Sequence, residues 1–364
     1  VRVGVATPGK ALSQRAPMNL VFLVDVSGSM DQPDKLGLAK QALRELVAAL
    51  GPADSVALVT YAGSTEVVLP AVSGAEHRQL LAAIDRLRAD GSTAMGSGLE
   101  LAYQQARARM SAKAASRVIV LSDGDANVGP SSLDEMLRII DRGRQDGVTL
   151  STIGFGMGNY RAELMEQLGD RGNGNNYYVD SAAAARKLFT TDLVAMLEVA
   201  AKDVKLQVDF DPAMVARYRL LGYENRAIAD ADFRVDSVDA GEVGVGHQVT
   251  ALYEVALTAR ASQTTPLGAV RIRYKAPRAG DADAAREATF AMASGPAATF
   301  ASAPADLRFA TAVAGFADVL RGAEDAQRWS LAQIAEVARA TAGVDAIDPE
   351  VGVGDRAVLV TEQP

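Results

Sequence analysis

The fold of this chain is decided by residues 20–29, Leu-Val-Phe-Leu-Val-Asp-Val-Ser-Gly-Ser, in which five apolar residues run directly into Asp25. The apolar run is short, has no polar face and is closed by a polar turn, which is typical of a buried strand in a parallel sheet. In such a sheet, ligands bind outside the carboxyl ends of the strands. We therefore expect Asp25, Ser27 and Ser29 to lie at the rim of a parallel sheet.

Strands and helices alternate along the chain around this stretch. The apolar runs predict strands at residues 56–61, 118–121, 148–155 and 177–179, and the helical periodicity predicts helices at 33–50, 76–87, 98–110, 133–144, 161–168 and 183–199. Residues 64–69 follow the strand at 56–61 after a two-residue link, which favours an antiparallel edge hairpin. The pattern predicts an α/β domain over residues 18–200, with a doubly wound, mostly parallel sheet and helices on both faces.

The pattern changes near Lys202. Polar and apolar residues then alternate in five stretches, which predicts an antiparallel β domain over residues 201–300, with strands at 204–210, 215–222, 249–258, 269–274 and 288–293. Residues 225–246 are acidic and contain glycines, so we expect a surface loop there.

Both ends of the chain are expected to belong with the β domain. Residues 301–364 contain two helical stripes, and we expect two helices packed on the β domain with Phe309, Val313, Phe316 and Leu320 facing the core. Residues 1–17 contain a strand and a polar linker. Because strands flank the α/β domain on both sides, we predict that the strand at 1–6 pairs with the β domain, so that the α/β domain is inserted into it.

Composition excludes several kinds of site. The 364 residues include no cysteine and two histidines, so thiolate metal sites, Fe–S clusters and a histidine-rich zinc site are excluded. The formal net charge of −8 argues against nucleic acid or an anionic membrane surface as the main partner. With 49% hydrophobic and 23% charged residues, the chain has the composition of a folded globular protein.

Two further loops should reach the rim at Asp25. Asp123 follows the strand at 118–121, and Thr93 lies just before the helix at 98–110. Carboxylate and hydroxyl oxygens are hard ligands, which select Mg²⁺, Mn²⁺ or Ca²⁺. The sequence therefore predicts a divalent-cation site, with Mg²⁺ first and Mn²⁺ or Ca²⁺ as alternatives, formed by Asp25, Ser27, Ser29, Thr93 and Asp123.

The Asp-x-Ser-x-Ser signature with the later Thr and Asp resembles the metal-ion-dependent adhesion site of von Willebrand factor A (vWA) domains. The resemblance implies that Ser27, Ser29 and Thr93 bind the metal directly, while Asp25 and Asp123 act largely through water. It also implies an open coordination position that takes an acidic residue of a partner protein.

The resemblance extends to the bacterial YfbK-like group of vWA proteins through the stretches at residues 19–30, 154–160, 172–175 and 221–226. This implies an exported, extracytoplasmic protein. One departure is Met95, which stands beside Thr93 where small residues are usual and is expected to narrow the site.

Several of these residues also have interpretations that need no metal ion. Ser29 or Asp31 alone could cap the following helix. Asp125 and Asn127 are explained by turn chemistry as well as by a role at the ion. The Gly154-x-Gly156-x-Gly158 sequence is interpreted as a tight turn, because its spacing differs from that of a dinucleotide-binding loop.

The resulting hypothesis is a metal-dependent binding module of adhesion type, and not an enzyme. Its partner would be a protein that supplies an Asp or Glu, with no nucleic acid and no membrane insertion. A structural or assembly role with a loop-stabilising metal is one alternative. The other is a metal-assisted hydrolase, for which Asp125 is the candidate general base.

Overall fold

The structure of the protein is a computed structural model. It describes residues 1–9, 14–92, 94–111, 113–124, 133–156, 160–190, 197–222, 228–236, 238, 240–261, 264–277, 279, 283–292, 299–323 and 329–341. Among these residues, no helix is both long and apolar enough to cross a lipid bilayer.

The chain forms two compact units. The parallel-sheet unit comprises Lys10–Val199, and the antiparallel unit comprises Val1–Gly9 together with Ala200–Pro364. Strand β1 (Arg2–Ala6) pairs antiparallel with β11 (Gln248–Leu257) in the second unit. This pairing confirms the prediction that the parallel-sheet unit is inserted into a domain formed from both ends of the chain.

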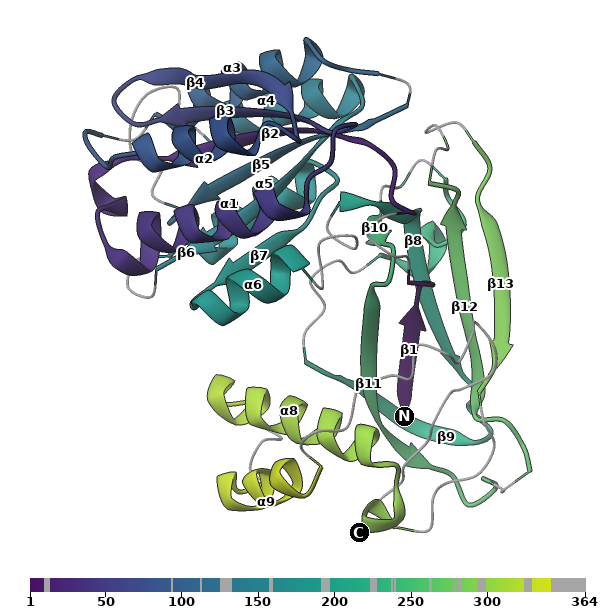
Figure 1. The fold of residues 1–364 in the computed structure, drawn as a ribbon. Coiled ribbons are helices and arrows are strands. Elements are labelled where there is room, and N and C mark those ends of the chain that lie inside the picture. Colours follow the sequence, from purple (N-terminus) through teal and green to yellow (C-terminus); the bar gives the residue numbers. More distant parts are fainter. Residues whose placement is uncertain are drawn as a thin grey trace. The chain divides into compact units, whose positions relative to one another are not determined.

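The sheet of the parallel-sheet unit has six strands in the order β4-β3-β2-β5-β6-β7 (Figure 1). Strands β3 and β4 pair antiparallel, and the other neighbours pair parallel, which confirms the mostly parallel sheet with an antiparallel edge. The strands are β2 (Met18–Asp25), β3 (Ser55–Tyr61), β4 (Thr65–Ser73), β5 (Ala115–Ser122), β6 (Val148–Phe155) and β7 (Asn176–Val179).

Helices cover both faces of this sheet, as predicted. The helices are α1 (Leu38–Ala49), α2 (His77–Arg86), α3 (Met95–Arg107), α4 (Leu133–Gln145), α5 (Ala162–Arg171) and α6 (Ala182–Thr190). Leu20, Phe22 and Val24 of β2 pack with α1, α2 and α6, whereas Val21 and Leu23 pack with α3, α4 and α5. Because alternate residues of β2 enter two cores, the strand is apolar throughout.

Two boundaries differ from the predicted ones. The helix predicted at 33–50 begins with a π-helical turn, Pro33–Gly37, before α1. The helix predicted to reach residue 199 is described as α6 (Ala182–Thr190), Leu197 is helical as well, and Val199 already begins strand β8 (Val199–Phe210). Periodicity alone does not separate an α-helical from a π-helical turn, because both keep apolar residues on one side.

The antiparallel unit contains two sheets. One has the order β1-β11-β9, and the other has the order β10-β8-β12-β13. The remaining strands are β9 (Val215–Leu221), β10 (Gly241–Gly244), β12 (Gly268–Lys275) and β13 (Arg286–Ala291). Side chains from both sheets share one core, which includes Val3, Val215 and Val270. Strand β10 corrects the prediction that residues 225–246 are loop throughout; it is short and glycine-bearing, so its sequence has little strand character.

Helices α8 (Ala305–Arg321) and α9 (Leu331–Thr341) complete this unit. The predicted core stripe of α8 is wrong, because Val313, Phe316 and Leu320 are 53%, 45% and 70% exposed. Leu307 and small neighbouring residues of α8 instead pack on Leu252 of β11. A helical stripe shows which residues share a face, but not that another element covers it.

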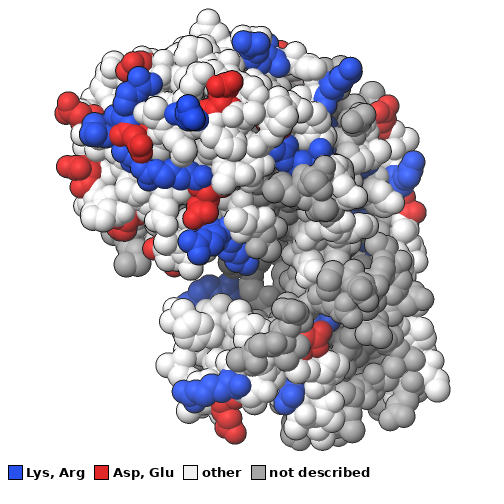
Figure 2. All heavy atoms as spheres, in the orientation of Figure 1, with Lys and Arg blue, Asp and Glu red and all other residues white. Residues whose placement is uncertain are grey.

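On the face drawn in Figure 2, basic and acidic side chains are interspersed. In the parallel-sheet unit, exposed ion pairs include Arg44–Asp85 and Arg107–Asp146. Exposed pairs of this kind contribute little to stability.

Candidate metal centre at the sheet rim

The turn after β2 brings two serine hydroxyls together. Strand β2 ends at Asp25, and Gly28–Met30 form a single 3-10 turn. The Oγ atoms of Ser27 and Ser29 lie 3.1 Å apart, as expected when alternate residues of a turn point to the same side. Ser27 is buried and Ser29 is partly exposed, so the hydroxyl pair lies at the boundary between the core and solvent.

Asp25 is held rigidly beneath this turn. One carboxylate oxygen accepts a hydrogen bond from the backbone N–H of Ser27, at 2.9 Å. The other accepts from the hydroxyls of Tyr61 and Ser122, at 3.1 and 2.7 Å. Burial raises the pKa of the Asp25 carboxyl to about 6, although the hydrogen bonds from Ser27 and Ser122 lower it. A cation nearby would favour the charged carboxylate.

The second predicted carboxylate, Asp123, follows β5 and is fully buried. Its Oδ2 accepts a hydrogen bond from the ammonium of Lys35 at 2.9 Å, and the same ammonium donates to the backbone carbonyl of Ser29, also at 2.9 Å. Ser122, the residue before Asp123, donates from its hydroxyl to Asp25 at 2.7 Å, and the charge of Asp123 contributes to raising the pKa of Asp25. Both carboxylates therefore lie at the carboxyl ends of adjacent strands, as predicted.

The loop that contains Thr93 also reaches this rim. The N–H of Gly28 donates to the carbonyl of Gly91, and the N–H of Asp90 donates to the carbonyl of Val26, at 2.9 and 2.7 Å. Residues 90–92 thus lie against the turn that carries the serines. Thr93 itself lies outside the described residues, as do Asp125 and Asn127.

The atoms at the rim suit a hard cation. Two carboxylates and a hydroxyl pair offer oxygen atoms of the kind that hard cations bind, and the Lys35 ammonium shows that a positive charge fits beside Asp123. No group of three or more His, Cys, Asp or Glu side chains gathers anywhere in the described part of the chain. Any metal bound here would therefore depend on hydroxyl ligands as well as carboxylates.

Sequence reasoning missed three side chains that complete this arrangement: Lys35, Tyr61 and Ser122. Tyr61 pairs with Asp25 in the register of β2 and β3, and Ser122 precedes Asp123, so a register argument could have found both. Lys35 carried no signal, because a lysine in a helical stretch is ordinarily exposed.

Packing within the protein explains Met95 and two of the glycines after β6. Met95 is fully buried in the core with Leu99 and other residues of one sheet face. Gly154 and Gly156 leave room for side chains of the protein, since a Cβ at either would lie within 2.5 Å of the Tyr160 ring or the Lys35 stem, respectively. Internal packing thus accounts for these two glycines without a bound dinucleotide; Gly158 lies outside the described residues.

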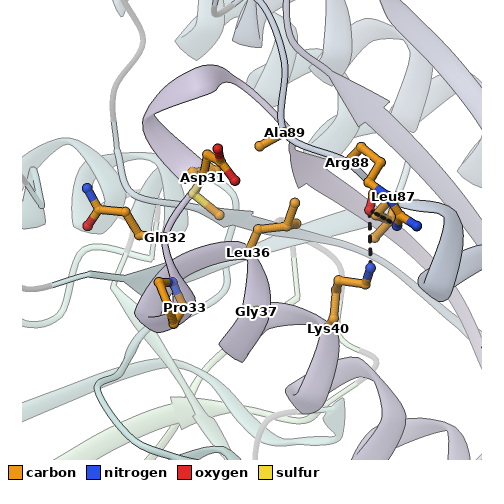
Figure 3. Close-up of a pocket in the computed structure, with 10 residues that line it drawn as sticks. Asp31, Gln32, Pro33, Leu36, Gly37, Lys40, Leu87, Arg88 and Ala89 are labelled. Carbon is orange, nitrogen blue, oxygen red and sulfur yellow. Dashed lines mark hydrogen bonds between the residues drawn. The ribbon is translucent and has the colours of Figure 1, made fainter.

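A hollow of about 300 Å³ lies next to the serine turn (Figure 3). Its walls come from the turn after β2, the start of α1 and the segment after α2. Lys40 donates to the carbonyl of Leu87 on one side, and Asp31 lies on the other (Figure 3). The lining residues are Met30, Asp31, Gln32, Pro33, Leu36, Gly37, Lys40, Leu87, Arg88 and Ala89.

Family models match nearly the whole chain. The von Willebrand factor type A domain model matches residues 19–191, and the model described as "Uncharacterized protein YfbK, C-terminal" matches residues 195–350. These matches agree with the division of the structure near residue 199.

Among curated proteins, the chain is similar to "Uncharacterized protein YfbK" of Escherichia coli, with 37% identity over 95% of this chain and 62% of that protein. It is also similar to "Uncharacterized protein sll0103" of Synechocystis, with 25% identity over 77% of this chain and 67% of that protein. The chain thus spans about 62% of the length of the E. coli relative.

Among solved structures, the "von Willebrand factor type A from Catenulispora acidiphila" matches 94% of this chain and 82% of that chain, with a TM-score of 0.52 and 19% identity. This likeness concerns the fold alone. The matched residues include parts of both units of the present chain.

Proposed function

The chain is a von Willebrand factor A domain protein related to bacterial YfbK, and from this premise we propose that it binds a protein partner through a divalent metal ion. vWA domains commonly serve as protein-interaction modules. The observation that carries the metal-dependent form of this function is the convergence of Asp25, Asp123 and the hydroxyls of Ser27 and Ser29 at the sheet rim.

The chemistry of the ligands supports binding over catalysis. A divalent ion at this rim, Mg²⁺ first and Mn²⁺ or Ca²⁺ as alternatives, would be held partly by neutral hydroxyls, so it would keep charge with which to attract an outside carboxylate. Asp25 has both oxygens engaged by protein donors, so it fixes the serine turn in place. We therefore propose a partner that supplies an Asp or Glu, and no turnover.

The hollow next to the turn supports the same proposal. Met30 and Leu36 give it apolar walls only a few residues along the chain from Ser29. A partner chain whose acidic residue reached the rim would bring its neighbouring residue to this hollow. The extracytoplasmic location implied by the resemblance to YfbK-like proteins is retained as part of the proposal.

Calorimetric titration of Mg²⁺, Mn²⁺ and Ca²⁺ into chelator-treated protein tests the metal site. We expect saturable binding of at least one ion, weakened at least about tenfold in the double variant Ser27→Ala with Ser29→Ala, because ligand oxygens are lost. The matched control is Ser73→Ala with Ser111→Ala. These two serines lie near the end of β4 and the start of β5, at the end of the sheet opposite the rim.

Equal binding by the wild type and the Ser27/Ser29 variant would place the ion elsewhere. If the wild type binds none of the three ions, the rim has a structural role instead. The presence of the Lys35–Asp123 ion pair gives that second role a specific basis, because the protein itself then supplies the positive charge.

A further inference from the structure

We infer that the Lys35 ammonium is a built-in competitor of the metal, which holds the rim together without an ion and sets how tightly an ion binds. This inference rests on the proposed function, because it concerns the same rim. It assigns to Lys35 a task that the vWA signature does not contain.

The ammonium joins two of the three segments that would hold the metal. It donates to Asp123 of the loop after β5 and to the carbonyl of Ser29 in the turn after β2, both at 2.9 Å. The side chains of Lys35 and Asp123 are 4% and 0% exposed, so water contributes little to either charge. A metal ion bound between Asp123 and the serine turn would perform the same bridging.

Lys35 belongs to a π-helical turn. Lys35 lies in Pro33–Gly37, before the regular helix α1 begins at Leu38. A π-helical turn is wider than an α-helical one, and such turns are frequent at functional sites. The neighbouring Leu36 packs in the core with the residues of α1, while the Lys35 ammonium reaches the rim.

The loop after β6 is shaped to accommodate the lysine stem. A Cβ at Gly156 would lie 2.5 Å from Cε and 2.9 Å from Cγ of Lys35, so no other residue fits there without displacing the lysine. Gly156 also has a φ of +84°, a conformation that favours glycine. The loop after β6 therefore leaves room for the Lys35 stem, and this close packing gives Gly156 a structural role.

Charge balance makes the ammonium and a metal ion alternatives. Asp25 and Asp123 are buried carboxylates, and the Lys35 ammonium offsets part of their negative charge. A divalent ion next to the ammonium would be repelled by it, whereas an ion that replaces the ammonium would recover the full charge of Asp123. Binding of metal therefore requires that Lys35 move away from Asp123 or share it.

The test is the variant Lys35→Met, which keeps the length of the stem and removes the charge. We expect Mn²⁺ to bind to it at least about tenfold more tightly than to the wild type, because the repulsion is removed. We also expect the melting temperature of Lys35→Met to rise with Mn²⁺ more than that of the wild type, since the ion replaces the lost positive charge.

The antiparallel unit supplies a matched control. Lys275 is buried and makes an ion pair of 2.8 Å with Asp203, in a place without the serine turn. Lys275→Met removes an ammonium of the same kind, and its Mn²⁺ affinity should equal that of the wild type.

The outcomes separate this inference from the proposed function. Mn²⁺ affinity that is unchanged or weaker in Lys35→Met, with normal binding by the wild type, would overturn the inference and leave the metal site intact. If neither protein binds Mn²⁺, the inference fails, and the proposed function fails as well if the wild type binds neither Mg²⁺ nor Ca²⁺. Should Lys35→Met be unfolded without metal, refolding by Mn²⁺ would support the inference, and failure to refold would overturn it.

Discussion

Two lysine–aspartate ion pairs with buried ammonium groups, one in each unit, differ in what surrounds them. Lys35–Asp123 and Lys275–Asp203 have N–O distances of 2.9 and 2.8 Å, and both ammonium groups are buried. The first pair lies at the carboxyl ends of parallel strands beside two serine hydroxyls, whereas the second joins Lys275, at the end of β12, to Asp203 within the neighbouring antiparallel strand β8. We therefore expect a metal site at a lysine–aspartate pair only where further oxygen atoms, such as the serine hydroxyls of the rim, lie beside the carboxylate.

The largest expected effect is the loss of Asp123. Asp123→Ala leaves the buried Lys35 ammonium without its carboxylate, which should lower the free energy of unfolding by about 3–5 kcal/mol. Asp203→Ala should cost less, about 1–3 kcal/mol, because the Asp203 side chain is 17% exposed, whereas that of Asp123 is fully buried. Urea denaturation of both variants measures the difference; equal losses would mean that the rim pair is no more enclosed than the other.

A smaller effect is expected from adding a methyl group at two glycines. Gly156 and Gly147 share a positive φ, +84° and +85°, so alanine is strained at both. At Gly147 the new Cβ would meet only the end of Met110, at 3.8 Å, whereas at Gly156 it would collide with the Lys35 stem. Gly156→Ala should therefore cost about 1–3 kcal/mol more than Gly147→Ala in urea denaturation. A difference near zero would show that the lysine stem moves freely.

The smallest effect separates two buried tyrosine hydroxyls of the parallel-sheet unit. The Tyr61 hydroxyl donates to Asp25, so Tyr61→Phe should lower the free energy of unfolding by about 1 kcal/mol. Within the described part of the chain, the Tyr103 hydroxyl is buried without a hydrogen-bond partner, so Tyr103→Phe should be neutral or stabilising. Thermal melts of the two variants test this, and a neutral Tyr61→Phe would contradict the anchoring of Asp25.

The parallel-sheet unit was largely predictable from the sequence because its strands are apolar on both faces and its helices are amphipathic. The antiparallel edge β4 followed from the short link after β3, and the pairing of β1 followed from strands that flank the inserted unit. Strand β10 and the exposed stripe of α8 were missed. Both depend on which neighbours cover a segment, and local periodicity contains no such information.

Part of the candidate site also follows from the sequence, and part does not. The order of the strands brings Asp25 and Asp123 to one rim, so their proximity follows from the sequence once the fold is known. The position of Lys35 does not follow, because it requires a π-helical turn and a glycine over 100 residues away in the chain. The metal-ligand role of Asp25, Ser27, Ser29, Thr93 and Asp123 stays a prediction.

We propose that an ion bound at this rim keeps one coordination position open for a partner's carboxylate. Water-proton relaxation of the Mn²⁺-loaded protein tests it directly, because a carboxylate that binds to the ion displaces water from it. We expect the relaxation enhancement to fall on addition of a short peptide that contains one Asp, and to stay constant with the Asn version of that peptide. No bound Mn²⁺, or equal responses to the two peptides, would contradict the account.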